Sequence, residues 1–105
     1  MTIYIINSPV LTNYGDFRFQ PIDTNQARQL LANGFISAIG HQASAELLSQ
    51  HLNIQIPINR INITMQTGDK ALILRLLQRL PEGKILTSEE IQHTGFELAL
   101  LTKLT

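Results

Sequence analysis

The feature that most constrains the fold is a strongly apolar segment between Ala71 and Leu77, which Arg75 interrupts once. This segment is too short and too polar to cross a membrane, and we expect it to form a strand over residues 70–79. Alternate residues of a strand share a face, so Arg75 falls on the same face as Ala71 and Ile73. We therefore predict a sheet with one face that is only partly covered.

The composition bounds the size and class of the protein. The chain has 105 residues, of which 44% are hydrophobic and 15% charged, and this predicts one globular domain over residues 1–105. The formal net charge is zero, so we expect no binding to long DNA or RNA, and any nucleic-acid ligand should be small and locally held. The chain lacks cysteine, which excludes disulfides, cysteine–zinc sites and thiol nucleophiles. We find no signal peptide or membrane-spanning run and expect a cytoplasmic protein without a membrane partner.

Hydrophobic periodicity and end signals predict the other elements. Asp23 or Thr24 can cap a first helix, and Asn33-Gly34 ends it. We expect strands over residues 2–7, 17–19, 58–65 and 96–103, and helices over residues 25–32, 41–51 and from 88 to about 94. This order predicts an α/β fold, a single-domain mixed β-sheet flanked by helices.

Within the predicted strand over residues 58–65, two sets of side chains alternate. Ile61, Ile63 and Met65 share one face, and Arg60, Asn62 and Thr64 share the other. The polar face is therefore one candidate ligand surface.

Two further stretches carry chemically useful side chains. Gly40 and His41 open a predicted helix, where an imidazole meets backbone N–H groups that can seat a phosphate. Arg79, Glu82 and Lys84 surround a predicted turn after the apolar strand. The two stretches together suggest chemistry on a phosphodiester, and the polar loop after the first strand could line a site.

The sequence resembles a family of small ring nucleases, first met as archaeal-virus proteins of unknown function and then as viral anti-CRISPR enzymes, with cellular homologues. The resemblance covers nearly the whole chain in the same order. It is carried by Ser37-Ala38-Ile39-Gly40-His41, by Asn59-Arg60, by residues 78–87 (Gln-Arg-Leu-Pro-Glu-Gly-Lys-Ile-Leu-Thr), by Asn7-Ser8 and by residues 11–15. The resemblance implies a homodimer that binds cyclic tetra-adenylate, the second messenger of type III CRISPR immunity. It also implies cleavage of this ring to linear di-adenylates without a metal or another cofactor.

The resemblance also implies roles for individual residues. The family's catalytic histidine falls on His41, its site arginine on Arg79 and its site glutamate on Glu82. Histidine suits protonation of a leaving oxygen near neutral pH, and arginine suits the growing phosphate charge. We expect Glu82 to orient Arg79, a ribose hydroxyl or the imidazole. The expected ligand-binding residues are Asn7, Ser8, Thr12, Asn13, Gly40, Ser44, Arg60, Gln78 and Lys84.

The sequence departs from the family pattern after the Gly-His pair. Gln42 and Ala43 stand where the family often has an acidic residue and a hydroxyl, and the first hydroxyl here belongs to Ser44. Ser8 and Thr12 both remain candidates for a second site hydroxyl.

Other interpretations stay open at the level of sequence. A non-catalytic module that sequesters or senses the cyclic nucleotide is the main alternative, and an interaction adaptor is another. His41 could simply cap its helix, and Arg79 with Glu82 could form a surface ion pair. The histidines do not have metal-ligand spacing, so we expect no metal site. The sequence does not separate a viral role from a cellular one.

Overall fold

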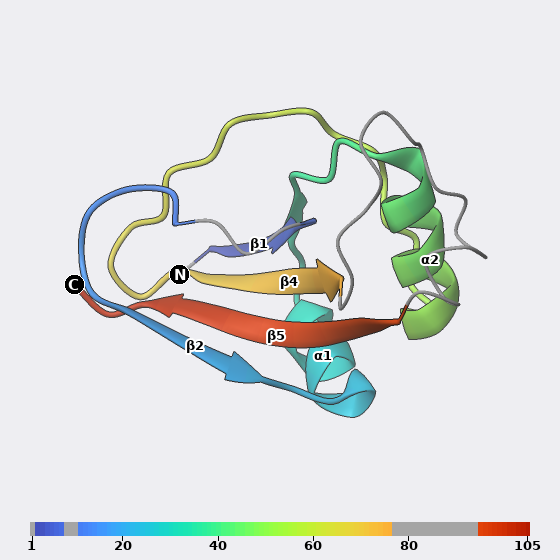
Figure 1. Cartoon of the computed structure of the whole chain (residues 1–105), viewed down its shortest axis with the longest axis horizontal. Coiled ribbons are helices and arrows are strands. Elements are labelled where there is room, and N and C mark those ends of the chain that lie inside the picture. The colour runs from blue at the N-terminus through green and yellow to red at the C-terminus, as the bar shows by residue number, and fades with distance from the viewer. Residues whose placement is uncertain (1, 8–10, 77–94) are drawn as a thin grey trace.

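The computed structural model describes residues 2–7, 11–76 and 95–105 (Figure 1). The helix predicted from residue 88 and the end of the strand predicted over residues 70–79 lie outside these ranges. The described residues form a five-stranded sheet in the order β2-β5-β4-β1-β3. The strands are β1 (Ile3–Ile6), β2 (Phe17–Pro21), β3 (Ile36–Ser37), β4 (Lys70–Leu76) and β5 (Phe96–Lys103).

The sheet is mixed, as predicted. Strand β1 runs parallel to both β3 and β4, whereas β5 runs antiparallel to both β2 and β4. Two helices, α1 (Thr24–Leu31) and α2 (Gln42–Leu52), complete the described elements. The α/β class is therefore confirmed.

Helix α1 begins and ends where local signals predict. The Asp23 carboxylate accepts a hydrogen bond from the Gln26 N–H at 2.7 Å, and the Gln26 side chain accepts one from the Asp23 N–H at 2.9 Å. This reciprocal pair is a capping box, which satisfies two N–H groups at the helix start. The helix ends just before Gly34, whose φ of +112° lies in a region that glycine adopts without strain.

The two faces of the sheet bury different sets of apolar side chains. On the helix-covered face, one core cluster joins the sheet residues Ile5, Leu72, Leu74 and Leu98 to Ala27 and Leu31 of α1 and to Leu48 of α2. The opposite face, which no described helix covers, buries Ile6, Met65, Ala71, Ile73, Ala99 and Leu101. This is the face predicted from the strand parity of Arg75, and its guanidinium there pairs with exposed Glu97 at 3.2 Å.

The strand predicted over residues 58–65 is wrong, because this stretch contains neither strand nor helix. Ile61 is 43% exposed and Met65 is fully buried, although a strand would have placed both on one face. The main chain is held by separate partners instead of a ladder. The Asn59 N–H donates to the Ile39 carbonyl at 2.8 Å, and the Met65 N–H donates to the Thr12 hydroxyl at 3.1 Å. The polar face expected from alternation therefore does not form.

None of the helices in residues 2–7, 11–76 and 95–105 combines the length and the apolar character that crossing a membrane requires.

Candidate active site at the start of helix α2

The candidate site is centred on His41, which is the N-cap residue of α2. The His41 backbone is extended, with φ −118° and ψ 127°, and the first helical hydrogen bond runs from the Ala45 N–H to the His41 carbonyl. The imidazole is exposed and makes no capping hydrogen bond. The N–H groups of the first turn therefore have no acceptor within the helix and can meet an anion. The prediction that Gly40 and His41 open a helix is confirmed.

Arg60 lies against Gly40, the residue before His41. Its Nε donates to the Gly40 carbonyl at 2.9 Å. A Cβ at position 40 would stand 3.2 Å from the Arg60 side chain, so a glycine at this position gives the arginine room to approach. The described residues form one ion pair, between Arg75 and Glu97. Arg60 is therefore not neutralised by any described carboxylate. Arg60 is exposed and is bonded to the residue directly before the exposed His41.

A set of main-chain and side-chain hydrogen bonds holds residues 57–60 beside residues 37–40. Ser37, which is 5% exposed, donates from its hydroxyl to the Pro57 carbonyl at 2.6 Å. Asn59 donates from its side chain to the Ser37 carbonyl at 2.9 Å. We did not assign roles to Ser37 and Asn59 from the sequence, although both stand within the motifs that carry the resemblance. They position Arg60 beside the start of α2.

The strand order also places a predicted ligand-binding residue, Asn7, at the end of the sheet where the parallel strands finish. Because β1 is parallel to both β3 and β4, the carboxyl ends of these strands meet at one edge, which in Figure 1 is the edge beside α2. Asn7 follows β1 directly at this edge. Crevices at the carboxyl ends of parallel strands are common ligand sites.

Thr12 and Asn13 lie at the other end of the sheet. The Asn13 side chain donates to the Met65 carbonyl at 3.2 Å, and Thr12 donates to Asn13 at 2.6 Å. Their loop is also tied to the C-terminal end of β5, where the Leu104 N–H donates to the Asp16 carbonyl at 2.7 Å. This end of β5 pairs with the amino end of β4, so within one chain the loop is not brought to His41.

The other predicted site residues divide into two groups. Ser44 is in the first turn of α2, where its side chain is 6% exposed. Ser8, Gln78, Arg79, Glu82 and Lys84 lie outside the described residues, and their predicted roles stay predictions.

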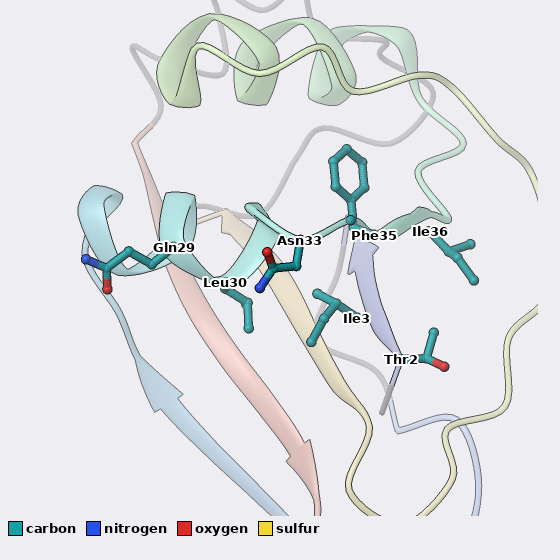
Figure 2. Close-up of a pocket in the computed structure, with 8 residues that line it drawn as sticks. Thr2, Ile3, Gln29, Leu30, Asn33, Phe35 and Ile36 are labelled. Atoms are coloured by element: carbon teal, nitrogen blue, oxygen red, sulfur yellow. The ribbon is translucent and has the colours of Figure 1, made fainter.

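Neither the hollow beside α1 nor any metal-holding group of acidic and histidine side chains in the described residues extends this site. A hollow of about 500 Å³ lies between the end of α1 and the amino end of β1, where Figure 2 shows Leu30, Asn33 and Ile3 around it. Its described lining residues include none of the predicted site residues. Within the described part of the chain, no three histidine, aspartate or glutamate side chains gather as a group that could hold a metal ion.

Comparison with known proteins places the chain among viral and bacterial relatives. It is 37% identical over 109 aligned residues to uncharacterized protein 26 of Sulfolobus islandicus filamentous virus (isolate Iceland/Hveragerdi), covering 98% of this chain and 92% of that protein. It is 31% identical over 107 aligned residues to uncharacterized protein YddF of Bacillus subtilis (strain 168), covering 99% of each.

A solved structure shares the fold. B116 of Sulfolobus turreted icosahedral virus (STIV) matches with a TM-score of 0.72 at 24% identity, covering 97% of this chain and 99% of that one. Residues 3–98 match the family described as STIV B116-like. The chain therefore belongs to the STIV B116-like family.

Proposed function

We propose that this protein is a metal-independent ring nuclease that cleaves cyclic tetra-adenylate to linear di-adenylates with 2′,3′-cyclic phosphate ends. The observation that carries the proposal is the hydrogen bond from Arg60 to Gly40, the residue directly before the exposed His41 at an uncapped helix start. A phosphodiester on this surface would meet N–H donors, a guanidinium and a proton donor together. The motif resemblance supplies the substrate class.

The proposed reaction uses the ribose, the protein and solvent water. A ribose 2′-oxygen attacks the neighbouring phosphorus, forming a P–O2′ bond while the P–O5′ bond breaks. The 2′-hydroxyl proton passes to solvent, and protonated His41 gives its proton to the departing 5′-oxygen. General acid catalysis of this kind typically contributes about 10²- to 10⁴-fold.

Arginines and the helix start supply the remaining stabilisation in this proposal. Charge grows on the non-bridging oxygens in the transition state, and donors already aimed at them stabilise it. We assign this role to the N–H groups at the start of α2, to Arg60 and to Arg79. Glu82 orients Arg79, a ribose hydroxyl or the imidazole.

A homodimer accounts for two cuts in one ring. A two-fold dimer presents the same patch twice, so a ring of four identical nucleotides can meet two equivalent sites. Each site then cuts one linkage, and two di-adenylates leave. We propose that the reaction takes place in the cytoplasm, which agrees with the cysteine-free composition.

The test is incubation of cyclic tetra-adenylate with the purified protein in EDTA, followed by mass analysis. We expect wild-type protein to release di-adenylates. His41→Ala should release at least about 100-fold less in the same time while still binding the ring. His51→Gln, at the other end of α2, is the matched histidine control and should retain activity.

The other outcomes separate the alternatives. Equal yields from wild type and His41→Ala would remove His41 from the mechanism. Tight binding by wild type without product would instead support a module that sequesters the ring. Absence of binding would refute both.

A further inference from the structure

A groove runs along α2 and begins one residue after His41. It has a volume of about 350 Å³ and lies between α2 and residues 56–58. Gln42, Ala45 and Glu46 line it from the helix, and Ile56 and Ile58 line it from the other side. We call this feature the α2 groove.

The α2 groove has an apolar floor and a polar rim. Ala45 and Ile56 are buried, whereas Ile58 is 48% exposed and presents apolar surface at the side of the groove. At the rim, the Gln42 amide donates to the Glu46 carboxylate at 2.9 Å, and both side chains are exposed. The face of a flat ligand would therefore contact apolar side chains, and its edge would meet the Gln42 amide and the Glu46 carboxylate.

The hydroxyl inside the α2 groove is already used by the fold. Ser49 donates to the Ala45 carbonyl at 2.7 Å and accepts from the Ile56 N–H at 3.0 Å. Among the described residues that line the groove, the hydrogen-bonding side chains left for an occupant are those of Gln42, Glu46 and Gln50.

The residues that line the α2 groove adjoin those of the candidate site along the chain. Gln42 follows His41, and Ile58 precedes Arg60 by two residues. Glu46 stands four residues after Gln42, about 6 Å further along the helix axis. A nucleotide with its phosphate at the start of α2 would have its base within reach of the groove.

We propose that the α2 groove receives an adenine base of the cyclic oligonucleotide and that Glu46 and Gln42 select it. This inference rests on the proposed function. The 6-amino group of adenine is a donor and suits the Glu46 carboxylate, while a glutamine amide can pair with the N6 and N7 edge of adenine. A 6-oxo purine sets an acceptor against that carboxylate and is disfavoured. Ala45 and Ile58 contact the face of the base.

The experiment compares two rings that lack the attacking hydroxyl. Binding of 2′-O-methyl cyclic tetra-adenylate and of its tetra-inosinate analogue, which carries 6-oxo groups, is measured by calorimetry with the full chain. We expect wild-type protein to prefer the adenine ring by about tenfold or more, since one good base contact discriminates by about 1–3 kcal/mol. Glu46→Gln should reduce this preference to about twofold, because its amide can also donate to a 6-oxo group.

Two further variants separate specificity from general damage. Ile58→Ser should weaken binding of both rings by about fivefold or more with little change in preference, because it removes apolar contact. Glu97→Gln removes another exposed carboxylate, on β5, and should change neither affinity nor preference.

An unchanged preference in Glu46→Gln would overturn the inference and leave the proposed function intact. Failure of the wild-type protein to bind either ring would also overturn it. The cleavage assay with unmodified cyclic tetra-adenylate then decides separately whether the proposed function fails.

Discussion

The hydrogen bond between Asn59 and Ser37 should determine whether Arg60 stays beside His41. Asn59→Ala removes a donor 2.9 Å from the Ser37 carbonyl. A neutral hydrogen bond contributes about 0.5–1.5 kcal/mol, and a partly buried carbonyl left without its donor adds to the loss. We expect the free energy of unfolding to fall by about 1.5 kcal/mol. For a domain of this size that loss lowers the melting temperature by roughly 6–12 °C.

The same substitution should loosen the chain locally. The Asn59 N–H donates to the Ile39 carbonyl at 2.8 Å, so its hydrogen exchange reports whether residues 57–60 remain against residues 37–40. We expect this amide to exchange about tenfold faster in Asn59→Ala, as follows from a loss of about 1.4 kcal/mol in local opening. Circular dichroism melts and amide exchange measure the two effects.

Asn62→Ala is the matched control for this experiment. Asn62 is exposed in the same segment and makes no side-chain hydrogen bond among the described residues. Its variant should melt within about 2 °C of wild type, as is usual for an exposed substitution. If Asn59→Ala melts together with Asn62→Ala and its amide exchange is unchanged, then Asn59 does not hold this segment and the argument for Arg60 fails.

Two other predictions concern carboxylates that bind main-chain N–H groups. Asp69 is 5% exposed and accepts from the Thr2 and Gln66 N–H groups, both at 2.8 Å. Asp69→Asn replaces one charged acceptor with a donor, and urea denaturation should show a loss of about 2–3 kcal/mol. Asp23→Ala removes the cap of α1 and should cost about 1 kcal/mol in a thermal melt, because the Gln26 N–H loses its acceptor.

Each of these substitutions has a control. Asp16 is exposed and makes its described hydrogen bonds through the main chain, so Asp16→Asn should change stability by less than about 0.5 kcal/mol. A loss in Asp69→Asn no larger than this would contradict the role given to its carboxylate. Asp23→Asn keeps an acceptor at the cap. If it is destabilised as much as Asp23→Ala, the capping bond is not the cause.

The parts of the fold that the sequence predicted are those determined by near neighbours. Asp23 is one of the two predicted caps of α1, and it caps the helix through Gln26, only three positions further on. Strand parity likewise placed Arg75 with Ala71 and Ile73 because it depends only on an extended backbone. The start of α2 at His41 is equally local, since Gly40 and the helix pattern after it are adjacent in sequence.

The parts that the sequence missed depend on distant partners. Alternation of isoleucine with polar residues over 58–65 predicted a strand, but a strand also needs a neighbour to pair with. The main chain there finds Ile39 and Thr12 at separate points instead. Thr12 follows Asn7 closely along the chain, yet its loop reaches the amino end of β4, so closeness in sequence did not predict a shared site.

The start of α2 carries positive character, and Glu46 adds a carboxylate in the second turn, on a chain whose formal net charge is zero. A helix N-terminus carries roughly half a positive charge, and Arg60 adds a full one close to it. The electrostatic field of so few groups is screened over about 8 Å at physiological salt. Because the formal net charge of the whole chain is zero, a long nucleic acid would gain little further electrostatic binding energy from the rest of the surface. In the proposed mechanism, ligand selection would therefore arise within the first two turns of α2, where His41 would face the phosphate and the α2 groove begins one residue later. This is why the substitutions at His41 and Glu46 test neighbouring parts of one site, and why a loss of cleavage and a loss of base preference should be separable.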